Sequence, residues 1–411
     1  MTVSTPREKT MANRTAPVML VSCCLAVFFP GALVFGFPGV LGPHWQATFE
    51  VGRADIGQIL FYVLAGAGLF MFLTGRLLAR IGPARAVLIS ALLGGTAVIL
   101  VGRATGIGWV YLWAFANGSS SAFAYLPAMT VVQRWYPKRR GLVTGLVSMC
   151  FGISGAVLAP VFSRLFLFLG YRQMTLATGI AAMLVGVLTA VLIRMPGSAG
   201  AAPLQAGQIK TPDGLSLNLA QSMRTRSFWL LWCTYAFAGA AGISMVTLSV
   251  SFGLKNGLTM TQAVLILTAF NITNGLSRFV SGYLSDITGR KQILGGSFLI
   301  AGLACFAFPH VTGLLIWAVF AALIGFSFGA LHSVTAPLVS DCFGMENFGQ
   351  IFGMVFTAFG FVSGALGPWL GGFLLDISGG NFTLVFAYLG ILLTVSVFLV
   401  WIVSPRAECT F

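Results

Sequence analysis

The sequence has very little charge, and acidic residues are the scarcest of all. Only 8% of its 411 residues are charged, and nine are aspartate or glutamate. A soluble domain usually carries about 25% charged residues, so this chain has too few to cover itself with a water-facing surface. Hydrophobic residues make up 57% of it. The composition therefore predicts a polytopic membrane protein that exposes its surface to lipid.

The sequence also lacks the motifs of metal, nucleotide and redox chemistry. It has no CxxC, HExxH or GxxxxGK[ST] pattern, so we expect no cofactor, no metal, no enzymatic activity and no primary pumping. The first apolar run is too long for a cleavable signal peptide and should remain as a helix. The cysteines show no pairing pattern and mostly lie in apolar runs, as small buried residues would; they are Cys23, Cys24, Cys150, Cys233, Cys305, Cys342 and Cys409.

Long apolar runs fill most of the chain. A membrane-spanning helix needs about 20 mostly apolar residues, and twelve runs meet this need: 18–41, 56–78, 84–104, 108–133, 141–168, 173–194, 228–252, 262–287, 291–309, 312–337, 348–376 and 381–403. We therefore predict an all-α membrane protein with twelve transmembrane helices in two pseudo-symmetric six-helix bundles, 18–194 and 228–403. Residues 1–17 and 404–411 would be tails, and 195–227 a central loop with a short interfacial helix.

The chain has a net charge of +14, and its basic residues are spread unequally between the two sides of the predicted spans. Cytoplasmic loops of membrane proteins are enriched in lysine and arginine. Most basic residues fall on one side of the predicted spans: Arg7, Lys9, Arg14, Arg76, Arg80, Arg85, Arg134, Lys138, Arg139, Arg140, Arg194, Lys210, Arg224, Arg226, Arg290, Lys291 and Arg406. We therefore expect both termini on the cytoplasmic side of the inner membrane, and no nucleic-acid partner.

One loop motif occurs twice, about half a chain apart. GRLLARIGPAR begins at Gly75 and GYLSDITGRK begins at Gly282. Both copies have leucine two residues and glycine seven residues after the first glycine, and glycines permit a tight turn. A carboxylate can cap the next helix or pair with loop arginines. We predict a conformational latch built from Gly75, Gly82, Arg85, Gly282, Asp286, Gly289 and Arg290.

This motif resembles GxLxDxxGRK, the loop signature of the major facilitator superfamily. The second copy is complete, whereas the first has Ala79 where the family prefers aspartate and lacks the closing Arg-Lys. RWYPKRRGLVTG, at 134–145, resembles the connection between helices 4 and 5 in the monocarboxylate porter and oxalate:formate antiporter branch. The same residues could be only an aromatic interface anchor, a proline stop and topology charges. The resemblance covers about residues 15–405.

Arg278 is the one basic residue predicted at mid-membrane depth. It lies eight residues before Asp286, or about 12 Å along a helix. A charge there is costly and must face the bundle interior or a wet cavity. The acidic residues all fall in predicted loops or helix ends, so we expect an anionic substrate to be its partner, since guanidinium binds carboxylate through two hydrogen bonds. Backbone carbonyls or polar side chains are the structural alternative.

The resemblance implies that the helix 8 arginine of this branch, here Arg278, binds the substrate anion. Animal monocarboxylate transporters usually have aspartate four residues earlier, where this chain has Asn274. They also have a cation on helix 1, and the oxalate exchanger has a lysine on helix 11; this chain has neither, with Val355 at the nearest helix 11 position. One buried cation favours a monocarboxylate such as lactate or pyruvate.

Other candidate substrate contacts are polar or aromatic residues on the predicted spans. Asn117, Ser121 and Tyr125 recur every four residues on one helix face, where helix–helix hydrogen bonds are the alternative. His332 could donate to a carboxylate or transfer a proton, or it could be a satisfied interhelical histidine. The predicted contacts besides Arg278 and Asn274 are Asn117, Tyr125, Gln58, His332, Phe352 and Phe359.

We therefore expect a monomeric secondary transporter that moves a monocarboxylate with a proton by alternating access. Anion exchange is the direct alternative. A drug or sugar carrier would need cavity carboxylates, or many amides and indoles, and neither is abundant here. A non-transporting sensor on the same scaffold is a further alternative, although sensors often have long soluble extensions.

Overall fold

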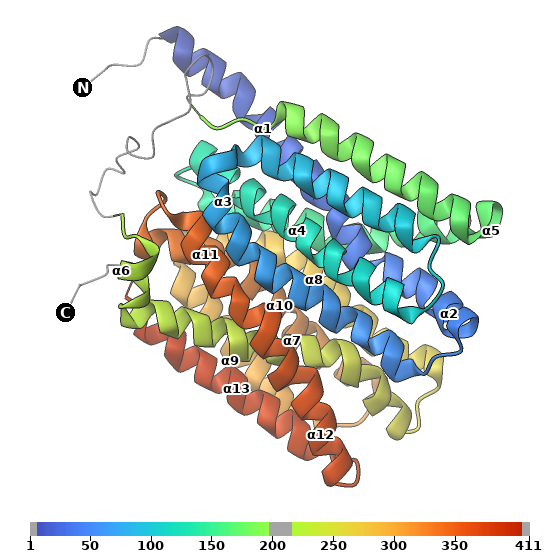
Figure 1. The fold of residues 1–411 in the computed structure, drawn as a ribbon. Helices are drawn as coiled ribbons and strands as arrows, with labels where there is room; N and C mark the ends of the chain where they lie inside the picture. The colour runs from blue at the N-terminus through green and yellow to red at the C-terminus, as the bar shows by residue number, and fades with distance from the viewer. Residues whose placement is uncertain (1–5, 197–215, 405–411) are drawn as a thin grey trace. The chain divides into compact units, whose positions relative to one another are not determined.

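The computed structural model describes residues 6–196 and 216–404, which form helices and no strand. Figure 1 shows these helices coloured along the chain from the N-terminus to the C-terminus. In chain order the elements are α1 (Pro6–Phe35), α2 (Phe37–Phe49), α3 (Arg53–Val101), α4 (Ile107–Trp135), α5 (Arg140–Leu192), α6 (Leu219–Met223), α7 (Arg226–Lys255), α8 (Met260–Thr288), α9 (Arg290–Ala307), η1 (Phe308–His310), α10 (Leu314–Phe343), α11 (Phe348–Thr357), η2 (Ala358–Ser363), η3 (Ala365–Trp369), α12 (Leu370–Ile377) and α13 (Phe382–Ile402).

Two of these helices each contain two membrane spans. α3 and α5 are interrupted at Gly82 (φ 75°, ψ 165°) and Gly170 (φ 73°, ψ 172°), conformations that glycine adopts without the cost of a Cβ. Among the described residues, nine helical stretches are long and apolar enough to cross a membrane. Dividing α3 and α5 at their glycines, and adding the less apolar α4 (29 residues), confirms the twelve predicted spans.

The first span is longer than predicted. It was expected to end at residue 41, but α2 continues it to Phe49. The chain bends at Gly36, which is followed by Pro38 in the first turn of α2. A Cβ on Gly36 would lie 2.8 Å from the carbonyl oxygen of Gly155 in α5. Glycine therefore allows the bend to pack directly against the backbone of another helix.

The helices belong to two compact units. The first comprises Met1–Val143 and Cys150–Lys210, and the second comprises Thr144–Met149 and Thr211–Phe411. In the first unit α4 packs against α3 and α1. In the second, α10 packs against α8 and α9, and α9 packs against α13. Thr144–Met149 lie within α5, so one short stretch of that helix groups with the second unit.

The segments between and beyond the bundles are only partly described. α1 begins at Pro6, so much of the predicted tail 1–17 is helical. The expected interfacial helix corresponds to α6, which Asn218 caps by accepting a hydrogen bond of 2.8 Å from the backbone N–H of Gln221. Residues 197–215 of the predicted central loop and 405–411 of the predicted C-terminal tail lie outside the described residues. The predicted domain limits stay predictions.

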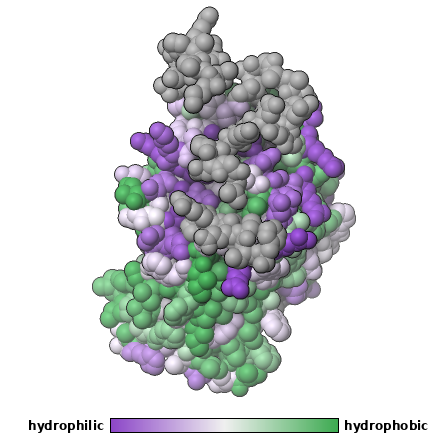
Figure 2. All heavy atoms as spheres, turned by 90° about the vertical axis from the view of Figure 1, so that its left-hand side faces the viewer, coloured by the Kyte–Doolittle hydropathy of each residue, from purple (hydrophilic) through white to green (hydrophobic). Residues whose placement is uncertain are grey.

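Large apolar side chains are exposed along the helices. In α13, Phe398 is 64% exposed and Trp401 51% exposed. The view in Figure 2 shows hydrophobic residues gathered in its lower part and hydrophilic residues in its upper part, around the grey atoms. Water would penalise so much exposed apolar area, whereas lipid does not. This surface is that of a membrane protein.

Candidate functional site

Arg278 lies in the middle of α8 with only 2% of its surface exposed. Its Nε and Nη2 donate hydrogen bonds of 3.4 and 3.3 Å to Oδ1 of Asn274, one helical turn earlier. Its Nη1 donates to the carbonyl oxygen (3.3 Å) and the hydroxyl (3.1 Å) of Ser148. Ser148 belongs to the short stretch of α5 that groups with the second unit. Three nitrogens of the guanidinium are thus held in one orientation.

These contacts are of the kind that the structural alternative for Arg278 predicts, with backbone carbonyls or polar side chains as partners. Asn274 and Ser148 both bond to Arg278. The acceptors in these bonds are an amide oxygen, a carbonyl and a hydroxyl, all neutral groups. They orient the guanidinium as a buried polar group requires. Asn274 and Arg278 are four residues apart, so helical spacing places them on one face of α8.

A polar and aromatic cluster adjoins Arg278 on α8 and α10. Ser281, three residues after Arg278, shares a hydrogen bond of 2.9 Å with Ser333 of α10. The neighbouring His332 is 6% exposed, and its Nδ1 lies 2.9 Å from the carbonyl oxygen of Phe328. A carbonyl only accepts, so Nδ1 carries the proton of this hydrogen bond.

Three aromatic rings surround His332. The ring centroids of Phe328, Phe359 and Tyr235 lie 4.7, 4.9 and 5.6 Å from that of His332. Phe359 belongs to η2, a π-helical segment in the helix 11 span; such segments occur often at functional sites. Sequence reasoning selected His332 and Phe359 separately but missed Tyr235, although it is fully buried in an apolar helix.

Phe352 lies elsewhere in the same unit. It is fully buried in α11 and stacks on Phe348 with a centroid distance of 5.4 Å and an interplanar angle of 9°. Its next ring contact is Phe356, at 6.1 Å. The contacts of Phe352 are therefore those of aromatic packing within α11.

The remaining predicted contacts lie in the first unit. Asn117 is fully buried in α4, and Tyr125 of the same helix is 4% exposed and meets the ring of Phe151 at 5.2 Å. Ser121, between them, donates to the carbonyl of Gly118 at 2.7 Å. Gln58 is exposed in the first turns of α3. Of these four residues, Asn117, Ser121 and Tyr125 share one face of α4, and Gln58 lies on α3.

The second copy of the repeated motif forms an ionic cluster. Arg290 follows Gly289 (φ 104°) and bonds to Asp286 (2.8 Å) and to the hydroxyl of Ser285 (3.0 Å). Its Nε also bonds to Asp341 of α10 at 2.6 Å, a partner outside the motif that sequence reasoning missed. The cluster links the ends of α8, α9 and α10.

The other latch residues are placed without such a cluster. Gly282 is buried in α8. In the first copy Gly75 is buried, Gly82 marks the break in α3, and Arg85 is exposed. The latch in the first copy of the motif therefore stays a prediction.

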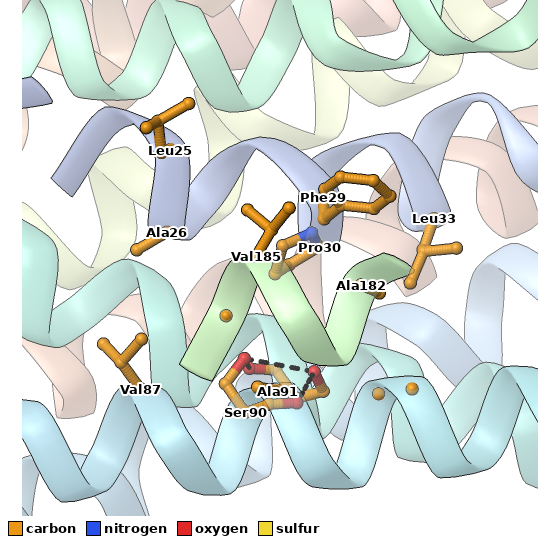
Figure 3. A pocket seen from close by; sticks show the side chains of 14 residues that line it. Leu25, Ala26, Phe29, Pro30, Leu33, Val87, Ser90, Ala91, Ala182 and Val185 are labelled. Atoms are coloured by element: carbon orange, nitrogen blue, oxygen red, sulfur yellow. Dashed lines mark hydrogen bonds between the residues drawn. The ribbon is translucent and has the colours of Figure 1, made fainter. Parts of the chain in front are cut away.

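A crevice in the first unit is distinct from these residues. Figure 3 shows Leu25, Phe29 and Leu33 of α1 in its upper part, Val87 and Ser90 of α3 in its lower part, and Val185 of α5 between them. Ser90 and Ser120 exchange hydrogen bonds of 2.7 and 2.9 Å between hydroxyls and backbone carbonyls. The lining is apolar or small and includes none of the predicted site residues.

The sequence matches the model of the Major Facilitator Superfamily over residues 23–261 and 236–408. The chain belongs to the major facilitator superfamily. Its members are transporters, not enzymes. The match covers nearly all the predicted spans and confirms both the resemblance and the multi-pass membrane fold.

Curated relatives place the chain within this superfamily. An uncharacterized MFS-type transporter of Escherichia coli, YhjX, is 25% identical over 77% of this chain and 76% of its own length. The oxalate:formate antiporter of Oxalobacter formigenes is 27% identical over 59% of this chain and 57% of its own length. Monocarboxylate transporter 13 of Rattus norvegicus is 25% identical over 89% of this chain and 84% of its own length. Two of these relatives are named for oxalate:formate exchange and for monocarboxylate transport, which is consistent with the resemblance to that branch.

Solved structures confirm the architecture. The transporter FucP in an outward conformation has a TM-score of 0.72 at 16% identity, covering 95% of this chain and 99% of FucP. The proton:xylose symporter XylE has a TM-score of 0.72 at 15% identity, covering 95% of this chain and 96% of XylE. At such low identity these similarities show the fold alone, and nothing about the solute.

Proposed function

We propose that this transporter moves a small monocarboxylate of the lactate or pyruvate type together with a proton, by alternating access. The observation that supports this most directly is the buried, oriented guanidinium of Arg278. Keeping a charge at this depth costs several kcal/mol or more, so intramembrane arginines usually mark a substrate or ion path. A carboxylate would bring the opposite charge, which Asn274 and the hydroxyl of Ser148 do not have.

The charge inventory favours one negative charge on the substrate. Of the lysines and arginines whose side chains the structure describes, Arg278 alone is buried. A second carboxylate would therefore lack a buried cation among these residues. Two relatives are named for carboxylate transport, the oxalate:formate antiporter and monocarboxylate transporter 13. A monocarboxylate, the substrate in the second name, matches the single buried cation better than a dicarboxylate does.

We also propose that transport is coupled to a proton. The carboxylic acid itself could supply the group that titrates, entering with its proton while Arg278 returns without a bound anion. Anion exchange is a second candidate, and the relationship to an antiporter favours it. The two differ in whether uptake needs an anion inside the vesicle.

Uptake of labelled lactate, pyruvate, formate and oxalate into proteoliposomes tests the proposal. We expect lactate or pyruvate uptake that an inward proton gradient increases and that needs no internal anion. Arg278→Lys should lose most of the uptake because an ammonium cannot form the planar two-bond contact. Arg103→Lys, at an exposed position, is the matched control. Normal uptake by Arg278→Lys would refute the site, and uptake only with internal anion would establish exchange.

We also propose that both termini lie in the cytoplasm of an inner membrane. The basic connection between α4 and α5, with Arg134, Lys138, Arg139 and Arg140, is typical of a cytoplasmic loop. A cytoplasm-active reporter fused after the last residue should be active, and a periplasm-active reporter at the same place should not. The reverse pattern would overturn the orientation.

A further inference from the structure

One end of the first unit carries an excess of exposed positive charge. Successive spans run in opposite directions, so the break in α3, the connection from α4 to α5 and the end of α5 lie at the same end of this bundle. Six lysines and arginines at these three places are exposed, and together they are called the basic surface: Arg76, Arg80, Arg85, Lys138, Arg139 and Arg194.

Contacts of tryptophan and phenylalanine hold parts of the basic surface in place. The indole Nε1 of Trp135, the last residue of α4, donates a hydrogen bond of 2.9 Å to the carbonyl oxygen of Arg194, just after α5. In α3, Cζ of Arg76 lies 4.3 Å from the ring centroid of Phe72, one turn earlier. Tryptophan is enriched where membrane helices reach the lipid headgroups. Trp135 therefore indicates that the basic surface lies at headgroup level.

The positive charge of the basic surface is not balanced within the described part of the first unit. The acidic side chains that the structure describes in this unit are Glu50 and Asp55, which flank the start of α3 at the opposite end of the bundle. Among the described residues, none of the six cations forms an ion pair. An anion from outside the unit is needed to balance them.

The second unit shows that cations at helix ends can be balanced internally. There Arg290 bonds to both Asp286 and Asp341, and Lys291 donates to the carbonyl oxygen of Val403 at 2.8 Å. The positive-inside rule depends on lysine and arginine, and aspartate and glutamate contribute little to it. Topology thus explains where the six cations lie, but it does not explain why they have no acidic partners.

Phosphate groups of lipids are the anions present at this level of a membrane. A guanidinium binds a phosphate through two parallel hydrogen bonds, and an ammonium attracts it as a point charge. The long apolar stems of arginine and lysine let their charges reach from the helix ends to the headgroups. Clusters of about four to eight basic residues beside membrane helices are typical of surfaces that bind anionic lipids.

We propose that the basic surface binds the phosphate groups of anionic phospholipids such as phosphatidylglycerol. Six positive charges without acidic partners attract a headgroup whose net charge is negative. Phosphatidylcholine has the same phosphate together with a cation, which the basic surface repels. The assignment concerns the lipid contact of the first unit alone, and it does not depend on which solute the transporter carries.

The test measures lipid binding to the purified full-length protein in a neutral detergent. Phosphatidylglycerol, phosphatidylcholine and inorganic phosphate are titrated separately, and bound molecules are counted by native mass spectrometry at low and high ionic strength. The double variant Lys138→Gln/Arg139→Gln removes two charges from the basic surface. The matched control, Arg103→Gln/Arg172→Gln, removes two exposed charges from the opposite end of the same unit.

We expect the wild type to bind phosphatidylglycerol more tightly than phosphatidylcholine. The preference should shrink at high ionic strength, because salt screens exposed charges. Lys138→Gln/Arg139→Gln should bind phosphatidylglycerol at least about tenfold more weakly, given the usual contribution of basic residues near an anionic lipid surface. The control should change this affinity by less than about twofold. Both variants should melt at the wild-type temperature without lipid, since all four side chains are exposed.

Three results would overturn the proposal. Equal affinity of the wild type for the two lipids would show that headgroup charge is not recognised. Equal losses in the double variant and its control would show that only the net charge of the protein matters. Binding of inorganic phosphate as tightly as phosphatidylglycerol would indicate a site for free anions. If Lys138→Gln/Arg139→Gln does not fold, Arg76→Gln/Arg80→Gln tests the same surface against the same control.

Discussion

Arg290, at the start of α9, donates a hydrogen bond of 2.6 Å from its Nε to Oδ2 of Asp341 near the end of α10. The same guanidinium bonds to Asp286 of α8 through Nη1 at 2.8 Å. One arginine thus joins the ends of three helices in the second unit. The repeated motif predicts the pair with Asp286, and the structure adds Asp341.

Asp341→Asn should destabilise the protein modestly. The side chains of Arg290 and Asp341 are 14% and 33% exposed, so solvent screens their attraction and we expect a loss of about 0.5–1 kcal/mol. The difference in melting temperature from wild type should shrink at high salt, because salt screens partly exposed pairs. Glu346→Gln, an exposed neighbour beyond α10, is the control. Equal shifts for both variants would show that the Asp341 contact contributes nothing.

Gly329→Ala should disrupt the packing of α10 on α8. A Cβ at Gly329 would collide with the hydroxyl of Ser277 and the backbone carbonyl of Asn274. Overpacking of this kind typically costs about 1–3 kcal/mol. The melting temperature should fall, and uptake with it, because Asn274 orients Arg278.

Gly296→Ala provides the control for that substitution. Gly296 lies inside α9, and a Cβ there would meet nothing within 4 Å. Replacing a glycine by alanine inside a helix usually gains about 0.5–1 kcal/mol. The two variants should therefore move the melting temperature in opposite directions. A fall of similar size in both would mean that contact between α8 and α10 is not the cause.

The fold could be predicted from the sequence because its evidence is local. Apolar runs of the required length identify the twelve spans, and a glycine-rich loop identifies the boundary after α8. The ends of helices are harder to predict from the sequence than the spans themselves. The first span is predicted to end at residue 41, yet α2 continues it to Phe49, beyond a bend at Gly36 where the absence of a side chain allows contact with α5.

The candidate site could be predicted only in part, because its contacts join distant residues. Asn274 and Arg278 are one turn apart, so helical periodicity brings them together. Ser148 is 130 residues away from Arg278, and no pattern links the two. The buried indole Nε1 of Trp113, which has no hydrogen-bond partner among the described residues, was missed for a similar reason. Whether a buried donor has a partner depends on every helix around it, which local sequence does not specify.

Asn274→Asp should weaken substrate binding near neutral pH. The new carboxylate would lie where Oδ1 of Asn274 now accepts bonds of 3.3 and 3.4 Å from Arg278. It would compete with the substrate for the guanidinium. We expect KM to rise by about tenfold or more, equivalent to at least about 1.4 kcal/mol.

The effect of Asn274→Asp should depend on pH. Protonation of the new carboxyl at low pH removes its charge, so KM should recover as the pH falls. Asn271→Asp, on the exposed part of the same helix, is the control and should change KM little. The measurement is initial uptake against substrate concentration at several pH values. A KM that equals the wild-type value at every pH would contradict the assignment of Arg278 as the anion ligand.

His332→Gln should retain proton-coupled uptake. Nδ1 of His332 donates to the carbonyl oxygen of Phe328, and the ring is enclosed by Tyr235, Phe328 and Phe359. Both features fix the imidazole in one tautomer and one orientation, which suits a packed donor better than a group that exchanges protons with water. Glutamine can preserve a donor, so we expect KM to rise by about tenfold or less, the effect of one hydrogen bond. An inward proton gradient should still increase uptake in this variant and in the control His310→Gln, whose histidine is exposed. If His332→Gln exchanged substrate across the membrane but no longer responded to the gradient, His332 would be the proton carrier and the carboxylic acid itself would not.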